Sequence, residues 1–159
     1  MQNAIVDDDT GDRVDAVYRA ESQRLFRALV GYTADRELAS DAMAEAFTRA
    51  LRDQHQIRAM TPWVWRVAFR LAAANLRAVN MLEADFSDQA TEEASDLPDL
   101  VRALRALPPK QRLAVVLHDY ADRPTHEVAT VLGSSSATVR VHLSQGRKRL
   151  KEMLEERDV

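Results

Sequence analysis

The 159-residue sequence has no cysteine, only four glycines, and no apolar run long enough to cross a membrane. The lack of cysteine excludes disulfide bonds and cysteine-ligated zinc. Four scattered histidines without ligand-like spacing predict neither a metal site nor a cofactor. The N-terminus is rich in aspartate and lacks the basic and then apolar pattern of a targeting leader. We therefore expect a cytoplasmic protein with no membrane insertion.

The formal net charge of −3 conceals two basic segments separated by an acidic one. Residues 1–15 sum to −4 and residues 83–99 to −7, whereas residues 16–82 and 100–159 each sum to +4. Clustered basic residues favour a polyanionic partner such as nucleic acid. An ordinary solvated surface is the alternative interpretation of the same charges.

Apolar residues recur at helical spacing throughout, and no stretch alternates as a half-buried strand would. We predict an all-α fold of two small helical domains joined by an acidic linker, the second containing a helix-turn-helix. The predicted divisions are an acidic N-terminal tail (1–13), a first domain (14–82), a linker (83–97) and a second domain (98–159). Thr61-Pro62 is expected to begin a helix that runs to about Leu82. Pro108-Pro109 is expected to separate two helices of the second domain.

Residues 124–150 contain the strongest local pattern, which predicts the helix-turn-helix. Ala129 and Gly133 are four residues apart, which suits a small residue at the helix crossing and a left-handed turn. In the final helix an apolar sector about 100° wide includes Val139 and Leu143, and the opposite face is short-chained and basic. That face is expected to enter the major groove of duplex DNA, although a basic amphipathic helix without DNA is the alternative. The predicted duplex contacts are Ser136, Ala137, Thr138, Arg140, Val141, Ser144, Arg147 and Lys148.

The predicted helix after Thr61 carries an arginine stripe with tryptophans beside it. Its arginines project within a sector about 40° wide. Trp63 and Trp65 are two residues apart and cannot share a face, so one of them is expected in the core. An aromatic ring beside arginines suits an unpaired nucleic-acid strand, although core packing of both rings is the alternative. The predicted strand contacts are Trp63, Trp65, Arg66, Arg70 and Arg77.

Asp41 and Glu45 lie one helical turn apart in a predicted helix of the first domain. No histidine, third ligand or glycine-rich loop accompanies them, so we do not predict an enzyme. An acidic patch in a basic segment favours a basic protein surface as partner. Simple pairing of Glu45 with Arg49 is the alternative.

The segments that carry a family resemblance are residues 41–51, 63–68, 104–112, 127–133 and 138–150. Together they resemble the bacterial RNA polymerase sigma factors of the extracytoplasmic-function (ECF) group over about residues 14–156. The most specific of them is Leu-Pro-Pro-Lys-Gln-Arg, ending at Arg112, ahead of the helix-turn-helix. The sequence departs from the usual pattern at Ala44, Phe69, Arg70 and Ala74.

The resemblance implies a subunit that is not itself an enzyme, has no small-molecule substrate, and directs core RNA polymerase to promoter DNA. It implies that the first domain is region two, which binds polymerase and opens the minus-ten element. The second domain would be region four, which binds the minus-thirty-five element. Asp41, Glu45 and Phe47 would lie on the polymerase-binding surface. An anti-sigma factor is a further partner that the resemblance implies.

Two other functions remain open at this point. One is a helix-turn-helix regulator that acts without polymerase and binds a two-fold symmetric operator. The other is a sigma mimic that titrates an anti-sigma factor without binding DNA. The basic final helix argues against the mimic, and the segment from Asp41 to Phe47 argues against the regulator.

Overall fold

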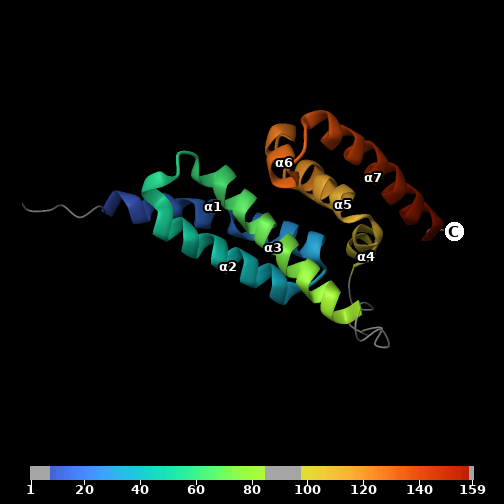
Figure 1. Ribbon diagram of the computed structural model, residues 1–159, viewed down its shortest axis with the longest axis horizontal. Coiled ribbons are helices and arrows are strands. Elements are labelled where there is room, and N and C mark those ends of the chain that lie inside the picture. The colour runs from blue at the N-terminus through green and yellow to red at the C-terminus, as the bar shows by residue number, and fades with distance from the viewer. Residues whose placement is uncertain (1–7, 85–97, 158–159) are drawn as a thin grey trace, which may run out of the picture.

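The structure is a computed structural model that describes residues 8–84 and 98–157. Every regular element in those two ranges is helical, as Figure 1 shows, which confirms the predicted all-α fold. The predicted linker falls largely on residues 85–97, outside the described residues. The elements are α1 (Asp8–Thr33), α2 (Arg36–Asp53), the short 3₁₀ helix η1 (Gln54–Gln56), α3 (Met60–Ala84), α4 (Asp99–Ala106), α5 (Pro109–Val115), the π-helical turn η3 (Val116–Tyr120), α6 (Thr125–Leu132) and α7 (Ser136–Arg157).

Helices α1, α2 and α3 pack together as an N-terminal lobe (Figure 1). The carboxylate of Asp35 caps α2, because it accepts hydrogen bonds from the backbone N–H groups of Glu37 and Leu38 at 2.9 and 3.0 Å. Alanines line the inner face of α2 at helical spacing, and such small side chains let α1 and α3 approach it closely. The fully buried members of this stripe are Ala39, Ala42, Ala46 and Ala50.

Helices α4 to α7 form a C-terminal lobe that contains the predicted helix-turn-helix, α6 followed by α7. Gly133 ends α6 with a φ of +66°, a backbone conformation that glycine adopts without strain. The backbone N–H of Ser134 closes the turn on the Ala129 carbonyl at 3.0 Å. Ser135 then caps α7 by accepting a hydrogen bond from the Thr138 N–H at 3.2 Å. Val139 and Leu143 of the predicted apolar sector are buried.

The predicted N-terminal tail is wrong for residues 8–13, because α1 already begins at Asp8. The guanidinium of Arg13 donates to the Ile57 carbonyl at 3.0 Å, which fastens this part of α1 to the segment before α3. Residues 1–7 lie outside the described residues.

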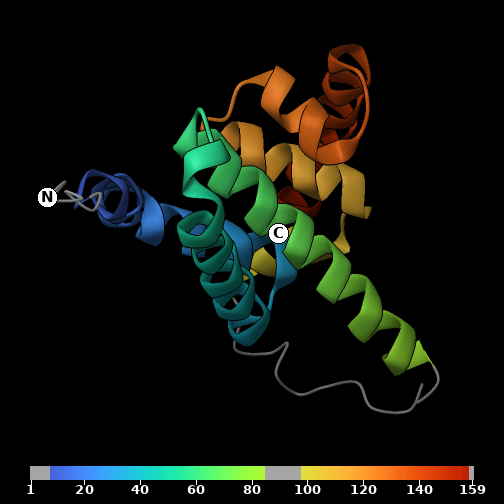
Figure 2. The same cartoon turned by 60° about the vertical axis from the view of Figure 1, so that its left-hand side comes forward.

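The two lobes pack directly against each other. Their buried apolar side chains form one continuous cluster that includes Leu29 and Phe69 from the N-terminal lobe and Leu117 and Val128 from the C-terminal lobe. Both views in Figures 1 and 2 place α6 beside the N-terminal half of α3, and α1 contacts α4. The predicted pair of domains therefore shares an extensive interface.

Replacing Gly146 by alanine is expected to destabilise the C-terminal lobe by about 1–3 kcal/mol. A Cβ at Gly146 would lie 2.9 Å from Cγ2 of the buried Val115 and 3.4 Å from the Gln111 carbonyl oxygen, because α7 crosses α5 closely there. Gly31→Ala is the matched control, since its nearest neighbour would be Leu104 Cδ1 at an ordinary 3.7 Å. Urea unfolding should show a lower midpoint for Gly146→Ala and an unchanged or higher midpoint for Gly31→Ala. Equal midpoints would contradict the close crossing.

Candidate nucleic-acid and polymerase interfaces

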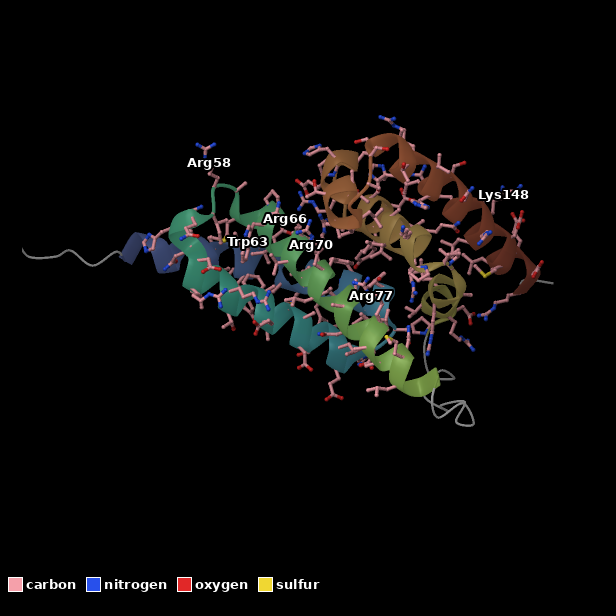
Figure 3. All side chains as sticks on the ribbon, in the orientation of Figure 1. Arg58, Trp63, Arg66, Arg70, Arg77 and Lys148 are labelled. Carbon is pink, nitrogen blue, oxygen red and sulfur yellow. The ribbon has the colours of Figure 1, made fainter. Side chains whose placement is uncertain are left out.

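The outward face of α7 gathers most of the predicted duplex contacts. Arg140 and Ser144 lie one turn apart and are exposed, and Val141 beside them is 52% exposed. Lys148 extends from the outer side of α7 (Figure 3). Ala137 and Thr138 are exposed near the helix start, whereas Ser136 is half-buried. This face combines short side chains at its beginning with a basic continuation, which suits entry into a major groove and contact with phosphates.

Arg147 differs from the other predicted duplex contacts because its own lobe holds it. Its Nε donates to a carboxylate oxygen of Asp119, at the end of η3, at 2.7 Å. This hydrogen bond raises the pKa of the Arg147 guanidinium. The pair is solvent-exposed, so its contribution to stability is small. Contact between Arg147 and DNA stays a prediction.

The arginine stripe lies along one side of α3. Figure 3 shows Arg66, Arg70 and Arg77 following one another down the helix, with Trp63 near its start. Arg70 and Arg77 are exposed, and Trp63 and Arg66 are half-buried. One half-exposed indole beside three guanidinium groups can stack on a base while the cations bind the strand backbone.

Arg58 belongs beside this stripe and is absent from the predicted contacts. It is exposed, and Figure 3 shows it extending outward from the segment before α3. No helical spacing relates it to Arg66, because it lies outside the helix. The sequence offered one reason to include Arg58 among the strand contacts: it lies close to Thr61-Pro62, where the helix was expected to begin.

Trp65 is not available to a strand in this structure, so its inclusion among the strand contacts is wrong here. The side chain is only 2% exposed, and its ring stacks on Phe69 with the centroids 6.1 Å apart. The Arg123 guanidinium of the C-terminal lobe also lies over this ring, 5.6 Å from its centroid. The expectation that one of Trp63 and Trp65 belongs to the core is confirmed, and Trp65 is that residue.

The predicted polymerase-binding residues divide between the surface and the core. Asp41 and Glu45 are exposed on α2, and Glu45 pairs with Arg49 at 2.8 Å. Phe47 is only 7% exposed, because it packs edge-on against Tyr18 with the ring centroids 5.0 Å apart. Phe47 therefore packs beneath the proposed polymerase-binding surface and is not itself exposed on it.

Two exposed apolar side chains lie close to Phe47 and were not predicted as contacts. Leu51 of α2 is 52% exposed, and Tyr18, which covers Phe47, is 48% exposed. Exposed apolar groups beside charges are typical of a protein-binding surface.

A groove of about 1010 Å³ runs between the lobes and is lined mainly by apolar side chains. Two of them, Leu100 and Tyr120, are 49% and 47% exposed.

The described residues bring no three metal-ligating side chains together. None of the described helices combines the length and the apolar character that a membrane span needs.

Comparison with known proteins shows which proteins this chain resembles in sequence. The family model for Sigma-70, region 4 matches residues 97–150. The RNA polymerase sigma-E factor of Streptomyces avermitilis is 35% identical over 124 residues, which are 77% of this chain and 63% of the relative. Its counterpart in Streptomyces coelicolor is 35% identical over 119 residues, 74% of this chain and 61% of the relative. The matched part of the chain thus spans a little over three fifths of these relatives.

Two solved structures share the fold. The sigma factor RpoE from Bartonella quintana, solved with the anti-sigma factor NepR, has a TM-score of 0.76 and 19% identity, covering 92% of this chain and 97% of that one. CnrH, solved with the cytosolic domain of CnrY, has a TM-score of 0.71 and 17% identity, covering 93% and 91%.

The C-terminal lobe, which contains the helix-turn-helix, is a Sigma-70 region 4 domain. The chain as a whole is related to the RNA polymerase sigma factors, among them members of the ECF group.

Proposed function

We propose that this chain binds core RNA polymerase and directs it to a limited set of promoters. The observation that carries the proposal is a pair of basic surfaces on different lobes with different chemistry. The outward face of α7, which includes Arg140 and Ser144, suits duplex DNA. The stripe on α3, with a half-exposed tryptophan, suits an unpaired strand. A regulator that only binds duplex DNA has no use for the second surface.

The division of labour follows from this chemistry. The C-terminal lobe binds the minus-thirty-five duplex, and the N-terminal lobe captures bases of the minus-ten element once they leave the stack. Capture offsets the few kcal/mol that unstacking costs. Joining the two lobes in one chain gives the second contact a high effective concentration, so two modest affinities yield one specific complex. The chain acts in the cytoplasm as a polymerase subunit and catalyses no reaction itself.

An anti-sigma factor is the second proposed partner. RpoE from Bartonella quintana was solved with the anti-sigma factor NepR, and CnrH was solved with the cytosolic domain of CnrY. On this chain the groove between the lobes is the proposed docking site, because exposed apolar side chains line it. Four basic and two acidic side chains at its rim favour an acidic amphipathic helix.

Run-off transcription with purified core polymerase on genomic fragments tests the function. We expect discrete transcripts that require both the chain and the core enzyme. If the chain gave no transcript and instead bound a symmetric operator without polymerase, the proposal would be wrong. The chain would then be a helix-turn-helix regulator that acts without polymerase.

The double substitution Asp41→Ala/Glu45→Ala is expected to weaken binding to core polymerase about tenfold, because it removes two exposed carboxylates from the proposed contact surface. Glu152→Ala/Glu156→Ala is the matched control, since these glutamates are also exposed and one turn apart, on α7. Binding measured by fluorescence anisotropy should change for the first pair only. An equal loss for both pairs would contradict the assigned surface.

A further inference from the structure

The apolar groove between the lobes has the size and the lining of a ligand site. Among the residues that line it, Ala28, Leu104 and Val116 are buried, and we call these three the groove floor. Leu100 and Tyr120 line it as exposed apolar side chains. Small-molecule sites are mostly apolar with a few well-placed polar groups, and the volume of about 1010 Å³ lies at the upper end of their range.

Gly31 of α1 widens this groove. A Cβ at Gly31 would lie 3.7 Å from Leu104 Cδ1 and 3.9 Å from Val116 Cγ2, which are both atoms of the groove floor. These are ordinary contact distances, so the packing of the lobes does not require a glycine here. Alanine would also favour the helix. The missing side chain therefore leaves space next to the groove floor that the protein does not fill.

Two of the four basic side chains that line the groove are compensated by carboxylates of the groove itself. Nε of Arg147 donates to a carboxylate oxygen of Asp119 at 2.7 Å. Lys151 pairs with Glu155 one turn further along α7, with 3.9 Å between the ammonium nitrogen and the nearer carboxylate oxygen. The side of the groove that the C-terminal lobe forms thus carries little uncompensated charge.

The other two basic side chains, Arg27 of α1 and Arg36 of α2, are uncompensated. Both line the groove from the N-terminal lobe and both are exposed. Neither makes an ion pair or a side-chain hydrogen bond with any residue that the structure describes. The positive charge of the groove is therefore concentrated on the side that the N-terminal lobe forms.

This combination of an apolar floor and two free guanidinium groups selects a class of ligand. A planar guanidinium gives an anionic head group charge-assisted hydrogen bonds in a fork geometry. A small polar anion would leave the floor uncovered, and a wholly apolar molecule would make no use of the two arginines. An amphiphile with one apolar chain and an anionic head uses both parts, because burying its chain is favourable wherever apolar surface leaves water.

We propose that the groove binds a single-chain amphiphile with an anionic head, which places the head at Arg27 and Arg36 and the chain along the groove floor. An anti-sigma helix, proposed above for the same groove, uses the same floor, so the two occupants exclude each other. The ligand site does not rest on the proposed function, because neither polymerase nor promoter DNA takes part in it.

Titration calorimetry of the full chain with dodecanoate, kept below its micelle concentration, tests the site directly. We expect saturable binding of one dodecanoate per chain. Dodecylammonium has the same apolar chain with a cationic head and should bind at least about tenfold more weakly. Butanoate has the anionic head with hardly any chain and should show no saturable binding. Absence of saturable dodecanoate binding, or equal binding of either comparison ligand, would overturn the proposal.

Arg27→Gln/Arg36→Gln tests the position of the head. Both side chains are exposed and unpaired among the described residues, so their replacement should leave folding intact. We expect dodecanoate to bind at least about tenfold more weakly, because its charge-assisted contacts are lost. Lys151→Gln is the matched control in the same groove and should change affinity by less than about twofold, since Glu155 already compensates Lys151. Equal losses in both variants, or none in the double variant, would refute the assigned position.

Leu100→Glu tests the position of the apolar chain. The exposed side chain lies in the first turn of α4, where a glutamate is well tolerated, and the substitution places a carboxylate on the apolar lining. We expect dodecanoate to bind at least about tenfold more weakly. Leu82→Glu, at an exposed site outside the groove, should leave the affinity unchanged. Unchanged binding by Leu100→Glu would overturn the proposed site. If run-off transcription failed while these results held, the proposed function would be wrong and the ligand site would stand.

Discussion

Arg140→Ala is expected to reduce binding to a minus-thirty-five duplex by roughly 5- to 150-fold, the range that corresponds to losing about 1–3 kcal/mol from one base contact. Arg140 is exposed near the start of α7, on one flank of the buried sector that contains Val139 and Leu143. A planar guanidinium there can contact a guanine edge through two hydrogen bonds. Binding should be measured at fixed ionic strength, because phosphate contacts depend steeply on salt.

Arg149→Ala is the control for Arg140→Ala. Arg149 is nine residues further along α7 and equally exposed, but it lies about 180° around the helix axis from Arg140. It should change affinity only slightly. A large loss for Arg149→Ala with none for Arg140→Ala would show that the other flank of α7 contacts DNA.

Phe69→Ala is expected to destabilise the protein by about 3–5 kcal/mol, the usual cost of emptying the site of a fully buried aromatic ring. Phe69 has no exposed surface and its ring contacts those of Trp65 and Tyr32, so its loss leaves a cavity between these two buried rings. That amount is a large share of the stability of a small domain. Urea unfolding monitored by tryptophan fluorescence would measure it.

Leu82→Ala provides the comparison on the same helix, because Leu82 is 62% exposed. Its effect should stay within about 0.5 kcal/mol. If Phe69→Ala cost no more than Leu82→Ala, Phe69 would not occupy the core position described above.

The helix-turn-helix was predictable because its determinants are local. Gly133 adopts a φ of +66°, and only a glycine-like residue does so freely, so the turn can be placed from the sequence. Pro108 and Pro109 likewise mark the boundary between α4 and α5, since proline cannot continue the preceding helix.

The packing of the lobes was not predictable, because it depends on contacts between distant residues. Arg112 and Tyr32 are 80 positions apart, and no periodic pattern relates them. Helical spacing showed that Trp63 and Trp65 face different ways, but only the second lobe decides that Trp65 is the buried one. Phe47 is the opposite case: it continues the apolar stripe of Ala46 and Ala50, a pattern that predicts burial.

The central claim is that α7 binds duplex DNA while α3 holds an unpaired strand within the same polymerase complex. The most direct test is chemical footprinting of that complex on a promoter found by run-off transcription, with DNase I for duplex protection and permanganate for unpaired thymines. We predict protection near minus thirty-five that Arg140→Ala removes, together with permanganate-reactive thymines near minus ten that diminish in Arg66→Ala/Arg70→Ala. Duplex protection without any reactive thymine, or two symmetric protected half-sites without polymerase, would contradict the account.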